Sequence, residues 1–212
     1  MSRGDILYDI SQPIRPAVPV WPGDTAFSIE RTWVLEGACP VNVSRLTMST
    51  HTGTHADSPL HYHNEGIAAA DVKLTPYLGP CQVIRVPPGS PFVEPTHFAD
   101  RLEPGLKRVL FHTYEKFPHQ RWESAFTAIA AEAIDVLAGH GVVLIGTDAP
   151  SLDPEQSKTL DAHHAVRRHG LAILEGLVLD GVPDGTYELI ALPLKIEGAD
   201  AAPVRAVLRS LS

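Results

Sequence analysis

The sequence predicts an α/β fold in which all 212 residues form one domain. A chain of this length buries roughly 70% of its unfolded surface on folding, and its 44% apolar residues are enough for a core. The first third reads as strands and proline-punctuated loops, and no composition shift marks a second domain. From residue 130 onward, helical spacing alternates with short apolar runs, which is typical of an α/β arrangement.

Short apolar or β-rich runs predict the strands of the first half. These runs are Leu7–Ile10, Phe27–Val34, Val41–Met48, Cys81–Val86 and Arg108–Phe111. The third run alternates between apolar and polar residues until Ser44 and Arg45, where the phase is lost. The lost phase predicts either a bulge at that point or a strand buried on both faces.

Two helices are predicted in the second half. Ala130–His140 has helical spacing, and Gly141 follows where a C-terminal cap glycine belongs. Asp161 is expected to cap a short helix that ends near His169. Further strands are predicted at Val142–Ile145, Tyr187–Leu192 and Val204–Leu208.

The bulk composition excludes several classes of protein. The chain has 17 basic and 25 acidic residues, a net charge of −8, which disfavours binding to phosphate backbones. No N-terminal apolar segment reads as a signal peptide, and no apolar run approaches the ~20 residues of a membrane span. Two single cysteines, Cys39 and Cys81, do not make a disulfide framework. We therefore expect a cytoplasmic protein with neither a membrane nor a nucleic-acid partner.

A histidine-rich segment at residues 51–61 carries the strongest chemical signal. His51, His55 and Asp57 lie within seven residues, and Gly53 and Pro59 argue against a helix. In an extended chain the odd positions share one face, which would align these side chains with His61. Two imidazoles and a carboxylate suit a divalent transition metal, and three ligands leave positions open for catalysis.

A second region contains Glu175, which interrupts the apolar run Leu171–Leu179. A carboxylate in such a run is costly to bury unless a metal or a charge pairs with it. For His163 and His164 the residues alone favour a solvated helix face. The C-terminal stretch 197–212 carries no motif and is not expected to contribute to function.

The segment HTGTHADSPLH fits the pattern H-x-G-T-H-x-D-x-P-x-H of the metal-dependent cyclase-like hydrolases, and the chain resembles that family nearly end to end. Within the family it looks most like the bacterial kynurenine formamidases. Other segments that carry the resemblance are Asp9–Ser11, Pro19–Asp24, Tyr77–Cys81, Thr147–Pro154, Asp161–His163, Ile173–Gly176 and Tyr187–Leu194.

The resemblance implies a swivelling β/β/α fold, a homodimer and two zinc ions in each subunit, although Mn²⁺ or another divalent metal is also compatible with such ligands. By matching positions, one metal would be held by His51, His55 and Asp57. The other would be held by His163, with Asp57 and Glu175 shared between the two. His61 would be the catalytic acid and base, and Trp21 would contact the substrate.

The implied reaction is hydrolysis of the formamide of N-formyl-L-kynurenine to L-kynurenine and formate, a step of tryptophan degradation. A metal-activated hydroxide would attack the formyl carbon, and His61 would transfer the proton to the leaving nitrogen.

Three alternatives stay open at this point. One is a family member that opens a cyclic amide such as isatin. Another is a non-haem iron oxygenase, because two histidines and one carboxylate also form a facial triad. The third is a metal-binding module without catalytic activity.

Overall fold

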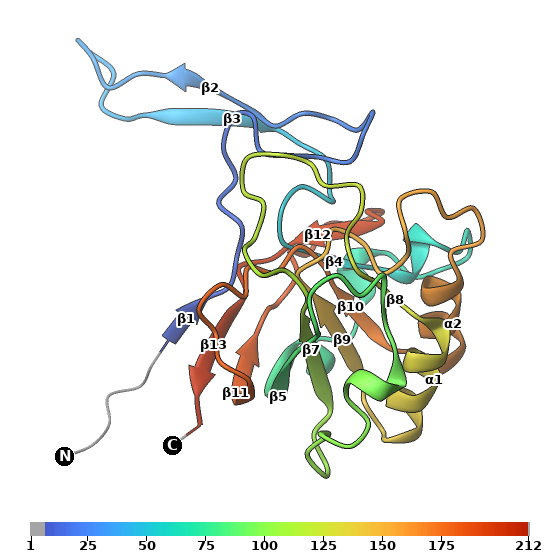
Figure 1. The fold of residues 1–212 in the computed structure, drawn as a ribbon. Helices are drawn as coiled ribbons and strands as arrows, with labels where there is room; N and C mark the ends of the chain where they lie inside the picture. The colour runs from blue at the N-terminus through green and yellow to red at the C-terminus, as the bar shows by residue number, and fades with distance from the viewer. Residues whose placement is uncertain (1–6, 212) are drawn as a thin grey trace, which may run out of the picture.

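A seven-stranded mixed sheet forms the centre of the fold, seen here in a computed structural model that describes residues 7–211 (Figure 1). The strand order is β1-β13-β11-β5-β7-β9-β10; the pairs from β1 to β5 are antiparallel, and those from β5 to β10 are parallel. The strands are β1 (Leu7–Asp9), β5 (Leu78–Arg85), β7 (Arg108–His112), β9 (Leu144–Thr147), β10 (Ala172–Leu174), β11 (Gly185–Ile190) and β13 (Val207–Ser210).

Both faces of this sheet are covered. Helices α1 (Ala131–Gly139) and α2 (Asp161–His169) lie together beside the parallel half (Figure 1). Along β7, Val109 and Phe111 join the apolar cluster that includes the helices, whereas Leu110 joins the cluster on the opposite face. Burial on both faces explains why these strands read as continuous apolar runs in the sequence.

Three two-stranded sheets complete the fold. They pair β2 (Ser28–Trp33) with β3 (Val43–Thr47), β4 (His55–Asp57) with β12 (Ala201–Pro203), and β6 (Phe92–Val93) with β8 (Ala128–Ile129). Four 3₁₀ turns are η1 (Pro59–His61), η2 (Ala69–Asp71), η3 (Thr75–Tyr77) and η4 (Pro95–His97). Within residues 7–211 no helix is long and apolar enough to cross a membrane.

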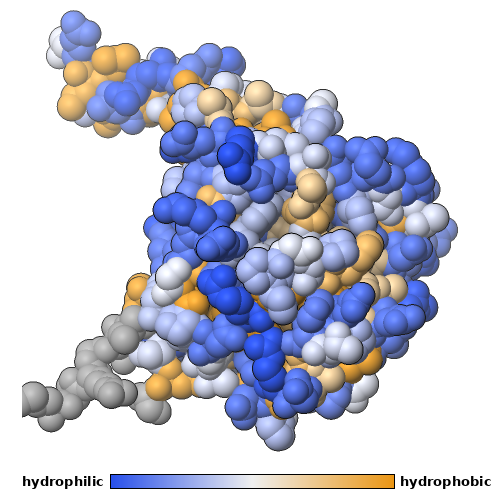
Figure 2. Space-filling model, in the orientation of Figure 1, coloured by the Kyte–Doolittle hydropathy of each residue, from blue (hydrophilic) through white to orange (hydrophobic). Residues whose placement is uncertain are grey.

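The predicted fold class is confirmed, and most predicted elements are present within a few residues of their expected ends. The β2–β3 hairpin corrects one expectation. Its register shift lies between Arg31 and Trp33, so the irregularity is on β2 rather than at Ser44 and Arg45. Both strands are exposed along their whole length as the hairpin projects from the body (Figures 1 and 2). No core face fixes the phase of alternation in such a hairpin.

The start of α2 corrects a second expectation. Asp161 is the first helical residue and makes no capping hydrogen bond. The backbone N–H groups of Ala162 and His163, which have no partner within the helix, instead donate to the carboxylate of Asp153, each at 3.0 Å. A residue from the preceding loop therefore supplies the anion that the helix N-terminus favours. Gly141, in contrast, has the left-handed φ of 78° expected of a cap glycine after α1.

Candidate metal centre

Six side chains predicted from the sequence meet at the carboxyl end of the parallel strands. His55 and Asp57 belong to β4, which runs beside β12. His61 ends the 3₁₀ turn η1, and His163 projects from the first turn of α2. Glu175 follows directly after β10, and His51 lies in the turn before β4. The carboxyl edge of a parallel sheet is the usual place for a ligand site in α/β folds.

The predicted alignment of the odd positions is right in its outcome but wrong in its cause. Only His55–Asp57 is a strand, so His55 and Asp57 share a face for the expected reason. The chain before this strand turns at Gly53, whose φ of 70° is left-handed. A turn, a short strand and a 3₁₀ turn therefore bring together what a single extended segment was expected to align.

A close backbone contact holds the two halves of the site together. His55 and Glu175 exchange backbone hydrogen bonds of 3.1 and 3.0 Å across an isolated antiparallel bridge. The next residue, Gly176, has a φ of 63°, and a Cβ there would lie 2.7 Å from the carbonyl oxygen of Gly53. Only glycine combines this conformation with such an approach. The segment after β10 that carries Glu175 can thus lie directly against the histidine segment.

The carboxylate of Asp57 has two occupied sides. Its Oδ1 lies 3.2 Å from His51 Nδ1 and 3.3 Å from His55 Nε2. Its Oδ2 lies 3.3 Å from His163 Nε2 and 3.9 Å from His61 Nε2. One buried carboxylate therefore stands between two pairs of imidazole nitrogens.

Glu175 repeats this two-sided arrangement. Its Oε2 lies 3.3 Å from His55 Nε2, and its Oε1 lies 3.7 Å from His163 Nε2. The backbone N–H of Leu152 also donates to Oε1 at 2.8 Å. The two carboxylates thus face His55 and His163 from different directions.

Three of the histidines have their other ring nitrogen engaged outside the cluster. His55 Nδ1 lies 2.9 Å from the Gly53 carbonyl oxygen, which can only accept a hydrogen bond. His163 Nδ1 lies 2.6 Å from the carboxylate of Asp153, and His51 Nε2 lies 3.0 Å from that of Asp200. Each outward nitrogen then carries the proton, so the inward nitrogen presents a lone pair to the carboxylates. Outer partners of this kind orient the histidine ligands of metal sites.

Lone pairs that face buried carboxylate oxygens require a cation between them. Among the described residues, His55 Nε2 and Asp57 Oδ1 are both buried and have no hydrogen-bond partner. Burial alone would lower the pKa of His55, but Asp57 and Glu175 outweigh it and raise that pKa to about 10. For His163 burial is likewise outweighed, chiefly by Asp153 and Asp57, and the pKa rises to about 10. A proton or a metal ion must satisfy the cluster, and the donor set suits a divalent transition metal.

Two carboxylates of the site were missed from the sequence. Asp153 caps α2 and holds His163, and Asp200 contacts His51 and lies 3.5 Å from His61 Nδ1. Asp200 belongs to the C-terminal stretch 197–212, which was not expected to contribute to function. That expectation is wrong, because Asp200 contacts two histidines of the candidate site. Asp153 stood in a segment that carries the resemblance, but no spacing rule assigned it a role.

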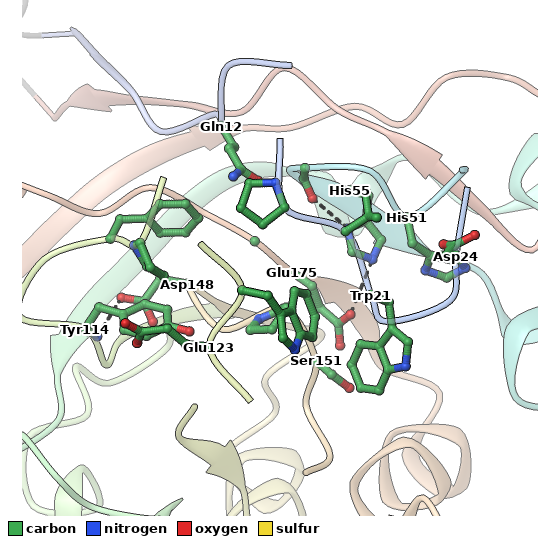
Figure 3. A pocket seen from close by; sticks show the side chains of 18 of the residues that line it. Gln12, Trp21, Asp24, His51, His55, Tyr114, Glu123, Asp148, Ser151 and Glu175 are labelled. Atoms are coloured by element: carbon green, nitrogen blue, oxygen red, sulfur yellow. Dashed lines mark hydrogen bonds and ion pairs between the residues drawn. The ribbon is translucent and has the colours of Figure 1, made fainter. Parts of the chain in front are cut away.

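A cavity of about 340 Å³ opens onto this cluster. Trp21 lines it (Figure 3). The ring centroid of Trp21 lies 5.3 Å from that of Trp122, and Phe126 packs edge-on against both. Arg121 and Glu123 also line the cavity and form an ion pair with each other. Further charged and polar lining residues include Asp24, Tyr114, Asp148 and Ser151 (Figure 3).

His63 and His164, to which no site role was assigned, lie outside the cluster. His163 is buried, whereas its neighbour His164 is exposed on α2, so the solvated-face interpretation is right only for His164. His63 is held by Arg167 at 2.7 Å and does not line the cavity.

The α/β fold thus carries a buried histidine–carboxylate cluster at its parallel edge, which is a candidate site for a divalent metal. The family described as "Putative cyclase" matches residues 8–154. A solved structure described as a potential metal-dependent hydrolase with cyclase activity is 30% identical over 99% of this chain and 100% of its own, with a TM-score of 0.83. The chain therefore belongs to the cyclase family of metal-dependent hydrolases.

Two further solved structures show how widely this fold is shared. A protein described as a predicted metal-dependent hydrolase from Bacillus stearothermophilus is 29% identical over 98% of this chain and 100% of its own, with a TM-score of 0.82. Isatin hydrolase A from Labrenzia aggregata, bound to benzyl benzoate, is 21% identical over 98% of this chain and 94% of its own, also with a TM-score of 0.82. At that identity the second likeness is evidence of the fold alone.

Removal of divalent metal is expected to lower the melting temperature. Without a metal, protons on His55 and His163 must compensate the buried carboxylates, and the binding free energy of the metal is lost. A bound metal adds about 4 kcal/mol at a thousandfold excess over its Kd. Thermal unfolding of chelator-treated protein, with and without added zinc, measures this. Glu175→Gln should weaken the zinc response. Asp135→Asn, which changes a surface carboxylate on α1 that also holds a histidine, should not. An unchanged melting temperature after demonstrated metal loss would contradict the assignment.

Proposed function

We propose that this protein is an arylformamidase that hydrolyses N-formyl-L-kynurenine to L-kynurenine and formate with two zinc ions. The observation that carries the proposal is the two-sided cluster at the foot of an aromatic-lined cavity. His51, His55 and Asp57 would hold one ion, and His163 would hold the other, with Asp57 and Glu175 shared between the two. Such bound cations make water nucleophilic near neutral pH and polarise a carbonyl oxygen.

His61 is the proposed proton carrier. It lies at the cavity wall, and its side chain is 33% exposed, so it can meet both the cluster and an incoming substrate. In the reaction the oxygen of water bonds to the formyl carbon and the C–N bond breaks. His61 takes a proton from the attacking water and gives it to the aniline nitrogen, which would otherwise leave as a strongly basic anion. The products are the free amine and formate.

The cavity wall supports an aromatic amide that carries an amino acid group. Trp21 and Trp122 offer flat apolar surface beside the cluster, which suits the aryl ring of the substrate. Arg121 and Glu123 place one positive and one negative group on the same cavity. An α-amino acid has the complementary carboxylate and ammonium, whereas a cyclic amide such as isatin has neither. This pairing favours the formamidase over the cyclic-amide hydrolase.

We further propose that the protein is a homodimer. The β2–β3 hairpin exposes Ile29, Trp33 and Leu46, with Trp33 59% exposed, and an isolated two-stranded hairpin is marginally stable in water. A second copy covering these residues would stabilise it. A cytoplasmic location and the lack of a nucleic-acid partner, consistent with a net charge of −8, stay predictions.

Zinc-loaded protein should release formate from N-formyl-L-kynurenine, and His61→Ala should reduce kcat by about 10²- to 10⁴-fold because the leaving nitrogen loses its proton donor. Formate release, isatin opening and bound zinc are measured in parallel. His63→Ala is the matched control, since that histidine lies outside the cluster. Loss of zinc in His61→Ala would make His61 a ligand instead. Faster opening of isatin than of the formamide would support the cyclic-amide alternative, and oxygen consumption would support the oxygenase.

Arg121→Met should raise KM for N-formyl-L-kynurenine by about 2- to 5-fold, the value of an exposed charge contact, because the Arg121 side chain is 79% exposed. KM for formanilide, which has no amino acid group, should not change. Arg209→Met removes an ion-paired arginine from β13, in the antiparallel half of the sheet and outside the cavity lining, and serves as the control. Equal effects on both substrates would remove Arg121 from amino acid recognition.

Light scattering after size exclusion should give the mass of two chains. Trp33→Glu combined with Leu46→Glu should give that of one, because the exposed hairpin would no longer be apolar. The same double change leaves the cavity lining untouched. A wild-type protein that elutes as a single chain would contradict the dimer.

A further inference from the structure

Asp200 is held beside the metal cluster by a second pair of strands. It directly precedes β12, in which Ala201 pairs with Asp57 of β4. The backbone N–H and the hydroxyl of Ser58 both donate to the carbonyl oxygen of Asp200, at 2.9 and 2.8 Å. The position of Asp200 is therefore tied to the strand that carries Asp57, although the two residues are far apart in the chain.

The two oxygens of the Asp200 carboxylate have different partners. Oδ1 accepts a hydrogen bond of 2.9 Å from the hydroxyl of Thr50. Oδ2 lies 3.0 Å from His51 Nε2 and 3.5 Å from His61 Nδ1. The rings of His51 and His61 are 4.3 Å apart between centroids, so one oxygen reaches both. Thr50 fixes the carboxylate so that this oxygen stays turned toward the histidines.

We propose that Asp200 is a positioning residue that sets the tautomers of His51 and His61 together. A carboxylate oxygen only accepts, so His51, which is hydrogen-bonded to it, carries its proton on Nε2. His61 Nδ1 lies 3.5 Å from the same oxygen without a hydrogen bond, and the negative charge of Asp200 favours the proton of His61 on that nitrogen. The lone pair of His51 is then on Nδ1, 3.2 Å from Asp57 Oδ1. That of His61 is on Nε2, the nitrogen that faces Asp57 Oδ2 across the cluster.

The two rings thus present opposite nitrogens to the site, and one carboxylate makes both choices. By acting on His51, Asp200 prepares a metal ligand. By acting on His61, it prepares the proton acceptor of the reaction. The second part rests on the proposed function, and the first does not. A carboxylate that merely satisfied Thr50 would have neither effect.

The test compares Asp200→Ala and Asp200→Asn with wild type by three measurements. Zinc affinity is measured by competition with a chromogenic chelator, and the tautomer of His61 by ¹⁵N NMR of the imidazoles in zinc-loaded protein. The kinetic constants for N-formyl-L-kynurenine are the third. The control is Asp135→Asn, because Asp135 is a similarly exposed carboxylate that holds His169 at 2.7 Å on the helical surface.

We expect zinc affinity to fall by about 10- to 100-fold in the Asp200 variants, as for other outer partners of metal ligands. The Nδ1–H tautomer of His61 should lose its dominance, and kcat should fall more than KM changes. Combined with His61→Ala, Asp200→Ala should give no further loss of kcat, because it acts on turnover through His61.

Unchanged zinc affinity together with an unchanged His61 tautomer in Asp200→Ala would overturn the proposal. Additive losses of kcat in the double variant would overturn the part that concerns His61. A wild-type protein without formamidase activity would instead defeat the proposed function. Zinc affinity and the NMR tautomer would still decide the role of Asp200 in that case.

Discussion

The site depends on the burial of two carboxylates opposite imidazole lone pairs. Asp57 and Glu175 are each 3% exposed. Burial of a charged carboxylate is costly in free energy unless a positive charge lies beside it. The protein does not supply that charge as lysine or arginine in the cluster. It supplies histidines whose outward ring N–H groups donate to a carbonyl group and to two further carboxylates, while their inward nitrogens take up a proton or hold a metal ion. This arrangement leaves a place for cations at the centre.

The fold around the cluster follows from this constraint. Glu175 reaches the histidine segment only because Gly176 permits contact with the backbone of Gly53. Asp153 accepts hydrogen bonds from the first turn of α2 and also holds the ring of His163. One carboxylate therefore links the start of the helix to the orientation of a candidate ligand. The pairing of β4 with β12 fixes Asp57 and brings Asp200 alongside. Secondary structure and site chemistry therefore share the same hydrogen bonds.

What could be predicted from the sequence was what lies close together in the sequence. The spacing of His51, His55 and Asp57 identifies a candidate metal site without any knowledge of the fold, because a turn and a three-residue strand suffice to align them. Glu175 stood out because a carboxylate interrupts an apolar run. The alternation of apolar runs and helical spacing after residue 130 likewise predicted an α/β arrangement in the later part of the chain.

What could not be predicted depends on pairings across long separations. Asp200 meets His51 across 149 residues, through a strand of only three residues that has no periodicity to detect. The contact of Asp153 with His163 required knowing that a loop, and not Asp161, caps the helix. The bulge in the exposed hairpin was misplaced because alternation carries no information where neither face is buried.

Selectivity in this fold is separate from the chemistry, because it comes from a different kind of segment. The chain between β7 and β8 has no regular structure, yet it provides Arg121, Trp122 and Glu123 to the cavity. Buried or partly buried carboxylates anchor it. Asp148 accepts hydrogen bonds from the backbone at the start of this loop, and Glu155 accepts one from the Trp122 indole. Loops held in this way can change their exposed side chains without disturbing the metal cluster. In this chain, substitutions at the exposed positions of this loop would therefore reshape the cavity wall and leave the histidine motif in place.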